Sequence, residues 1–145
     1  MKARVLFLHH NYPAQFRYLA LELAQNGCDV VFLSERNHVG NLPGIRHIPV
    51  DSTNILPHSS LDGQISCAER FRCALLSLRQ ESWIPDIAIS HTGWGCGLYI
   101  NWVFPSTRCI SYLEWWFKND AHDYNFDPLN KWWNYSEKSR LKLRQ

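Results

Sequence analysis

The sequence feature that most constrains the fold is a strand, helix and strand pattern between residues 5 and 34. Residues 5–8 (VLFL) form a run of strand formers, typical of a strand buried on both faces of a parallel sheet. Residues 28–33 (CDVVFL) have the same character. A right-handed crossover places two such strands side by side, so the sequence predicts the opening unit of a parallel α/β sheet.

The segment between these strands predicts a helix that begins after Pro13 and ends at Gly27. Apolar residues recur there at helical spacing, which predicts a core-facing stripe of Phe16, Leu19, Ala20 and Leu23. The opposite face is expected to be in water and carries Arg17, Glu22 and Gln25.

The rest of the chain alternates strands and helices in the same way. Strands are predicted at residues 45–50, 85–90 and 108–113, the first of them an edge strand because of Pro49. Helices are predicted from Ser59 or Ser60 onward, before Pro105, and at residues 128–144. The core face of the first of these helices is expected to be Leu61, Ile65, Ala68, Phe71 or Arg72, Leu75 and Leu78. This alternation favours a three-layer, Rossmann-like α/β sandwich with a mostly parallel sheet.

Composition excludes several classes of protein. A chain of 145 residues that is 46% hydrophobic and has seven tryptophans is expected to fold as one packed domain. A net charge of +2 gives no sign of nucleic-acid binding. No apolar run approaches membrane-spanning length, and a secretory signal has no room before the first strand, so a cytoplasmic location is expected. The five cysteines lie mostly in apolar patterns without CxxC, which favours reduced core thiols over metal ligands or disulfides.

Polar residues gather after the strands, and the carboxyl ends of parallel strands are where open α/β sheets bind ligands. The four candidate loops are His9-His10-Asn11, Ser34-Glu35-Arg36, His91-Thr92-Gly93-Trp94-Gly95 and Glu114-Trp115-Trp116. We expect these loops to converge at one rim of the sheet.

The distribution of glycine among these loops argues against a dinucleotide site, because the first turn has none. The first turn has Tyr12, Pro13, Ala14 and Gln15 where a dinucleotide fingerprint needs glycine, so a nicotinamide enzyme is rejected. Gly93, Gly95 and Gly97 are better placed, between a strand and a helix. They can let a ligand approach the backbone, or they can serve only a tight turn with close helix packing.

Three histidines and one glutamate are the titratable candidates. His9 and His10 are neighbours at a strand end, so we expect them to point to opposite faces and not to share a metal, one packing under a helix and the other entering the cleft. His91 lies just past a buried strand, where substrates bind. Glu114 interrupts the apolar stretch YLEWWF and must be functional or part of a structural ion pair.

Tryptophans close to these residues have several interpretations. Stacking on sugar faces, simple packing and cover by a second domain are all open for Trp94, Trp115, Trp116, Trp132 and Trp133.

Three segments of the chain resemble the N-terminal domain of family 4 glycosyltransferases, in particular a bacterial subgroup. They are LFLHHNYPAQFRYLALELAQNGCDVVFLS, PDIAISHTGWGCGLYINWVFP and RCISYLEWWF, and the resemblance runs from the first strand to the final helix. It implies one half of a GT-B architecture: an acceptor-side domain at residues 1–145, facing a donor-binding domain that is absent from this chain. It also implies transfer with retention from a nucleotide sugar, without a metal.

The resemblance implies roles for individual residues. Glu114 and His91 would be catalytic, Glu114 standing where many relatives have a histidine after the fifth strand. Substrate binding would fall to His10, Asn11, Gly93, Trp94 and Gly95. Ala14-Gln15 stands where many relatives have a Gly-Gly pair that touches the donor.

Partners follow from the same resemblance. The acceptor would be a carbohydrate or a lipid-linked molecule, and the complete enzyme could associate peripherally with a membrane. No E-x7-E donor signature follows the matched segments, so we expect the N-terminal half of a longer enzyme, inactive by itself. The competing interpretation is a stand-alone, non-catalytic binding or interaction module with the same fold.

Overall fold

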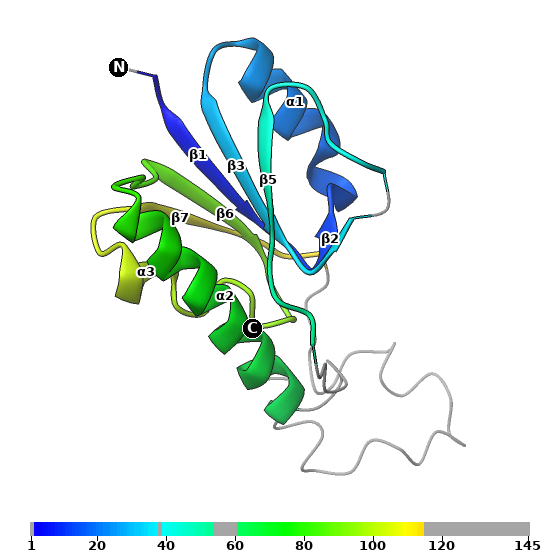
Figure 1. Cartoon of the computed structure of the whole chain (residues 1–145), viewed down its shortest axis with the longest axis vertical. Helices are drawn as coiled ribbons and strands as arrows, with labels where there is room; N and C mark the ends of the chain where they lie inside the picture. Colours follow the sequence, from blue (N-terminus) through cyan, green and yellow to red (C-terminus); the bar gives the residue numbers. More distant parts are fainter. Residues whose placement is uncertain (1, 38, 54–60, 115–145) are drawn as a thin grey trace.

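The described residues, 2–37, 39–53 and 61–114 of the computed structural model, form a parallel sheet with helices on both faces (Figure 1). The strands of the main sheet are β1 (Arg4–Leu8), β3 (Asp29–Ser34), β5 (Ile45–Pro49), β6 (Ile87–His91) and β7 (Arg108–Tyr112). Their order is β5-β3-β1-β6-β7, and every neighbouring pair is parallel. The predicted Rossmann-like sandwich is therefore confirmed, with β5 at an edge.

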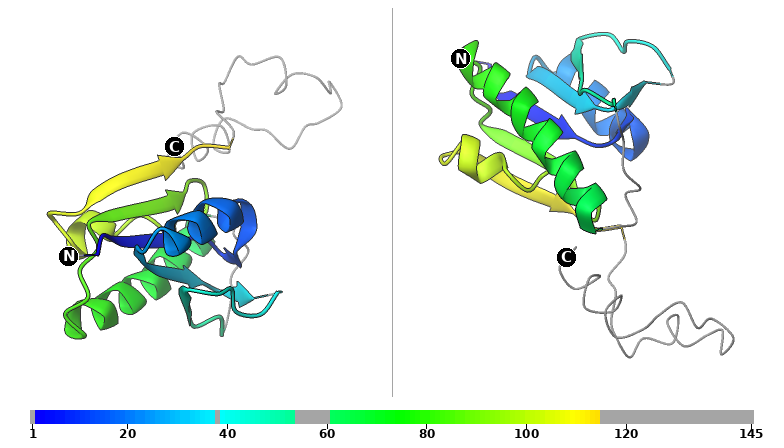
Figure 2. Two further views of the ribbon diagram at one scale, coloured as in Figure 1. Left: turned by 90° about the horizontal axis from the view of Figure 1, so that it is seen from above. Right: turned by 60° about the horizontal axis from the view of Figure 1, so that its bottom comes forward.

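The helices divide between the two faces of the sheet, as the two views of Figure 2 show. The 3-10 turn η1 (Ala14–Phe16) and helix α1 (Arg17–Gln25) cover one face. Helices α2 (Leu61–Gln80) and α3 (Ile100–Val103) cover the other. A short parallel ladder of β2 (Asn11–Tyr12) with β4 (Arg36–Asn37) lies beyond the main sheet. The predicted caps Ser59 and Ser60 and the predicted helix at 128–144 lie outside the described residues.

Alternating residues of the central strands build two separate cores. Leu6 and Leu8 of β1 face α2 and pack with Phe71 and Leu75. Their neighbours on the same strand, including Phe7, face α1 instead. Each face of β1 is thus apolar, which is why its sequence is a continuous apolar run rather than an alternating one.

The chain order places a reversal point in the middle of the sheet. From β1 the chain proceeds outward to β3 and β5, and then returns to add β6 on the other side of β1. The carboxyl ends of β1 and β6 therefore flank the point where the strand order reverses, which is where ligands bind in open α/β sheets.

The predicted core faces of α1 and α2 are largely confirmed, since Ala20, Ala68, Phe71, Leu75 and Leu78 are all buried, but one apolar residue in each helix departs from the prediction. Leu19, predicted to face the core, is 46% exposed, and Ile65 is 45% exposed. In α1 the predicted residues Ala20 and Leu23 do pack on the core, with Ala24 beside them. In α2 the residues buried in place of Ile65 are Gly63, Gln64 and Cys67.

All five cysteines are free, but not all of them are core thiols. Cys67 and Cys96 are buried and Cys28 is half-buried, whereas Cys73 and Cys109 are exposed. The expectation of core thiols is therefore wrong for those last two, which lie on the outer side of α2 and on the exposed edge strand β7. None of the helices described is long and apolar enough to cross a membrane.

Candidate functional site

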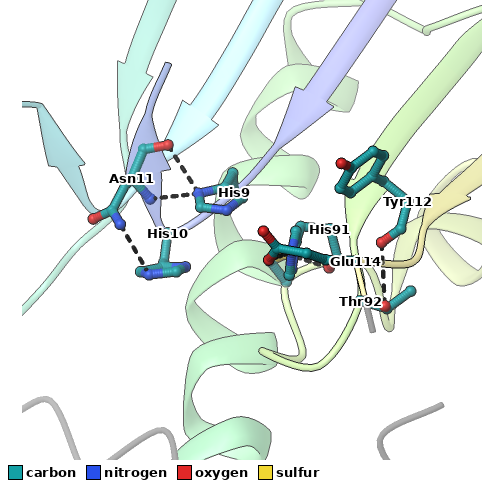
Figure 3. A network of polar contacts seen from close by, with 8 residues as sticks. His9, His10, Asn11, His91, Thr92, Tyr112 and Glu114 are labelled. Carbon is teal, nitrogen blue, oxygen red and sulfur yellow. Dashed lines mark hydrogen bonds and ion pairs between the residues drawn. The ribbon is translucent and has the colours of Figure 1, made fainter. Parts of the chain in front are cut away.

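Three imidazole rings meet where the strand order reverses, at the carboxyl ends of β1 and β6 (Figure 3). The rings of His9 and His10 are stacked, with centroids 4.5 Å apart and planes at 22°. The ring of His91 meets that of His9 edge-on, at 4.9 Å. The prediction that His9 and His10 point to opposite faces is therefore wrong. Strand β1 ends at Leu8, so both histidines lie in the turn, where strand alternation no longer applies.

His9 organises the turn after β1. It is 4% exposed, and its Nδ1 accepts a hydrogen bond of 2.9 Å from the backbone N–H of Asn11. The same Nδ1 also lies 3.0 Å from the backbone carbonyl oxygen of Asn11. Burial, together with the nearby His10 and His91, lowers the pKa of His9 to about 3, so this ring is uncharged near neutral pH.

His10 and Asn11 present the polar side of the same turn. The Asn11 amide Nδ2 donates to Nε2 of His10 across 3.0 Å. The other side of His10 meets the indole of Trp94, with ring centroids 4.8 Å apart. Trp94 belongs to the turn after β6, so this contact joins the first and third predicted loops.

Glu114 pairs with His91 across the last two strands. Nε2 of His91 lies 3.1 Å from Oε2 of Glu114. Figure 3 shows these two side chains next to each other. His91 is 6% exposed, whereas the Glu114 side chain is 67% exposed. The buried ring therefore donates to a carboxylate that still faces solvent. Nδ1 of His91 is buried and has no hydrogen-bond partner among the described residues.

The glycines after β6 are required for different structural reasons. Gly93 and Gly95 both have positive φ, +93° and +83°, as a tight turn of this kind requires. A Cβ on Gly95 would lie 2.4 Å from the Gln64 backbone oxygen of α2, and one on Gly97 would lie 2.3 Å from Ser90 Oγ. Gly93 has open space around it. Close helix packing thus accounts for Gly95, whereas at Gly93 only the backbone conformation favours glycine.

The second candidate loop, Ser34-Glu35-Arg36, has a structural role. Glu35 is buried and pairs with Arg70 of α2, whose Nη1 also donates to Ser66 Oγ at 2.7 Å. Ser34 Oγ lies 2.8 Å from Nε2 of His47 on β5. This loop fastens the rim to α2 and β5 rather than presenting groups to the reversal point.

Sequence reasoning placed Thr92 in a candidate loop but gave no individual role to it or to Cys96, and both contribute to the site. Thr92 joins β6 to β7, its N–H and its hydroxyl both donating to the Tyr112 carbonyl, at 3.0 and 3.1 Å. Cys96 Sγ donates to the His91 carbonyl at 3.3 Å, and burial raises the pKa of its thiol to about 12. A thiol of this kind stays protonated and holds the turn. Their position in the turn next to His91 was the available signal.

A cavity of about 300 Å³ adjoins these residues, between the first turn of α2, the glycine turn and β7. Its polar lining includes His91, Ser90, Thr92 and Ser111. Within residues 2–37, 39–53 and 61–114, no group of three or more His, Cys, Asp and Glu residues could hold a metal ion. Trp115, Trp116, Trp132 and Trp133 fall outside the described part of the chain.

The structure thus brings together most of the residues predicted for the site. His10, Asn11, His91, Trp94 and Glu114 gather at one rim, linked through ring contacts and hydrogen bonds. Gly93 and Gly95 form the turn beside them.

Comparison with known proteins gives one family. A sequence model described as "Glycosyl transferase family 4 group" matches residues 26–145. No curated protein matches the sequence. Among solved structures, the C-terminal domain of a hydrogenase from Pyrococcus furiosus aligns with a TM-score of 0.48 and 12% sequence identity, over 77% of this chain and 92% of that one. A similarity this weak carries no argument about function.

Proposed function

The chain belongs to the glycosyl transferase family 4 group, and from that premise we propose that it is the acceptor-side domain of a retaining glycosyltransferase. In this proposal the enzyme moves a sugar from a nucleotide sugar to a carbohydrate, free or linked to a lipid. A donor-binding domain completes the cleft. The reaction uses no metal ion.

The observation that carries the proposal is the pairing of Glu114 with His91 at the reversal point of the sheet. A carboxylate that is mostly exposed is held by a buried imidazole through Nε2 at 3.1 Å. One carboxylate oxygen is thereby fixed, and the other remains available to a ligand. This arrangement suits a group that orients a substrate hydroxyl, because the carboxylate is both accessible and held in one direction.

The proposed roles follow from these contacts. Glu114 accepts a hydrogen bond from the acceptor hydroxyl that attacks the donor sugar, and His91 positions Glu114. His10 and Trp94, whose rings lie 4.8 Å apart, offer an aromatic surface for a sugar ring. Asn11 holds His10 through its amide.

The donor itself is proposed to bind mainly outside these residues. The first turn has Pro13, Ala14 and Gln15 in place of a glycine pair, so its backbone is not open to a phosphate. Stabilising the leaving phosphate requires positioned donors or cations, and this electrostatic contribution is commonly the largest in catalysis.

The test is to incubate the purified chain with a panel of nucleotide sugars, measuring donor binding by calorimetry and turnover by nucleotide release. The chain alone should be folded, should bind donors weakly and should not turn over. The matched measurement adds the donor-binding domain and should restore transfer. Micromolar donor affinity or steady turnover by these residues alone would contradict the two-domain proposal. Absence of transfer with the donor-binding domain present would instead favour a non-catalytic binding module.

A further inference from the structure

The cavity beside His91 has a composition of its own. Three hydroxyl side chains, Ser90, Thr92 and Ser111, contribute to its lining. Two exposed apolar side chains, Ile65 of α2 and Leu98 of the turn before α3, also belong to the lining. No lysine or arginine lines it among the described residues.

We propose that this cavity binds one uncharged, hydroxyl-rich sugar ring of the acceptor and discriminates against acidic or phosphorylated sugars. The inference rests on the proposed function, since it names the substrate class of the same site. It adds a binding position and a charge preference that the family assignment does not contain.

The size and the chemistry of the lining fit a single ring. A volume of about 300 Å³ is at the lower end of the range for ligand pockets, so the cavity suits one sugar unit better than an extended oligosaccharide. Serine and threonine hydroxyls both donate and accept, as sugar hydroxyls do. Thr92 already donates to the Tyr112 carbonyl, which leaves its oxygen free to accept. Ile65 and Leu98 can cover the apolar C–H face of the ring.

The charges around the cavity decide against an anion. Glu114 lies at its edge, since its Oε2 is 3.1 Å from Nε2 of the lining residue His91. That ring nitrogen is directed at Glu114 and not into the cavity. The amino end of α2 would attract an anion through about half a unit of positive charge, but Asp62 in the first turn of α2 offsets it. Arg70, farther along α2, is paired with buried Glu35.

The binding experiment uses the chain without any donor. Methyl glycosides of neutral hexoses and of the matching uronic acids are titrated while amide shifts are recorded by NMR. The best neutral glycoside should bind about tenfold more tightly than its uronic acid, as expected for like charges close together at a protein surface.

Two exposed positions provide matched variants with little risk to folding. Ser111→Lys should reverse the charge preference by placing a cation in the lining, whereas Ser111→Thr should leave it unchanged. Ile65→Trp should fill the mouth and weaken every glycoside about tenfold or more, whereas Ile65→Leu should not. Amide shifts remote from the cavity report whether each variant is folded.

Three results of the binding experiments would overturn the inference: a uronic acid that binds as tightly as its neutral partner, neutral binding that Ile65→Trp leaves intact, or no binding of any neutral glycoside. Transfer to an acidic acceptor in preference to a neutral one would also overturn it, while leaving the transferase proposal standing. Neutral binding with the expected variant effects, but without transfer when the donor-binding domain is present, would support the cavity and contradict the transferase.

Discussion

The two ends of the parallel sheet both carry hollows lined by polar groups, but those groups are used differently. At the amino ends of the strands the hollow is the larger one, about 860 Å³, and is lined by residues that include Lys2, Asp29 and Asp86. There the carboxylates serve the fold: Asp86 accepts the Arg4 backbone N–H at 2.8 Å, and Asp29 accepts the Trp83 indole N–H at 2.7 Å.

At the carboxyl ends the cavity is smaller, about 300 Å³, yet its polar groups are less completely used. Glu114 is paired through one oxygen and remains exposed, and Nδ1 of His91 has no partner among the described residues. If the proposed function holds, the volume of a hollow is a poor guide to the site in this fold. Polar groups that are positioned by the protein and still available to a ligand are the better criterion.

The largest expected effect separates these two kinds of carboxylate. Glu114→Gln keeps the shape and an oxygen that can accept from His91, but it removes the charge. We expect kcat for sugar transfer to fall by about 100-fold or more, the size of a lost acid–base group, with the free energy of unfolding unchanged. The assay is steady-state transfer with the donor-binding domain present.

Asp86→Asn is the matched control at the amino end of the sheet, and its kcat should equal that of the unchanged protein. Equal turnover in both variants would remove Glu114 from the mechanism. Loss of turnover in Asp86→Asn alone would place the reaction at the amino end of the sheet and contradict the proposed site.

The fold was predictable because its signals are local. Parallel strands that are buried on both faces have continuous apolar sequences. All five strands of the main sheet lie within a residue or two of their predicted bounds. The meeting of His10, His91 and Glu114 at one rim was also predictable. His91 ends β6, while His10 and Glu114 follow β1 and β7, and these strands are parallel.

Other features depend on tertiary contacts that a sequence pattern does not contain. The contact between His91 and Glu114 requires the register of β6 and β7, in which His91 lies beside Tyr112. The stacking of His9 on His10 depends on β1 ending at Leu8, since an extension of the strand would send the two rings to opposite faces.

Two glycines of the turn after β6, Gly93 and Gly95, allow a comparison of stability effects within the carboxyl end of the sheet. Gly95→Ala adds a Cβ that would lie 2.4 Å from the backbone oxygen of Gln64, at a position with positive φ. Backbone cannot give way as a flexible side chain can, so we expect a loss of about 2 to 5 kcal/mol in the free energy of unfolding.

Gly93→Ala meets open space and carries only the cost of its positive φ, about 1 to 2 kcal/mol. Urea unfolding of both variants measures the difference. Equal losses would show that α2 does not press on the turn, and that packing is not the reason for glycine at position 95.

The pH dependence of stability tests whether His9 is a structural histidine among the site residues. Its pKa is lowered by burial from 6.5 to about 3, so at pH 5 the unfolded ring takes up a proton that the folded ring does not. Unfolding then binds a proton, and the free energy of unfolding should fall by about 2 kcal/mol between pH 7 and pH 5 from this group.

His9→Asn supplies the control for that measurement, because its amide oxygen can still accept from the Asn11 backbone N–H while nothing titrates. The fall in stability between pH 7 and pH 5 should be smaller in this variant by about the same 2 kcal/mol. If the free energy of unfolding falls by the same amount in both proteins, His9 takes up its proton in the folded state as well. The imidazole cluster would then carry charge at pH 5.

The smallest effect belongs to the amino end, where a carboxylate is expected to matter for stability and not for activity. Asp29→Ala leaves the indole N–H of the buried Trp83 without its 2.7 Å acceptor, which should lower the free energy of unfolding by about 1 to 2 kcal/mol. Asp29→Asn retains an acceptor oxygen and should lose less than half of that. Transfer measured well below the unfolding transition should be unchanged in both, because neither side chain reaches the rim that holds His91. A fall in kcat without a fall in stability would show that the larger hollow takes part in the reaction, and the distinction between the two ends of the sheet would no longer hold.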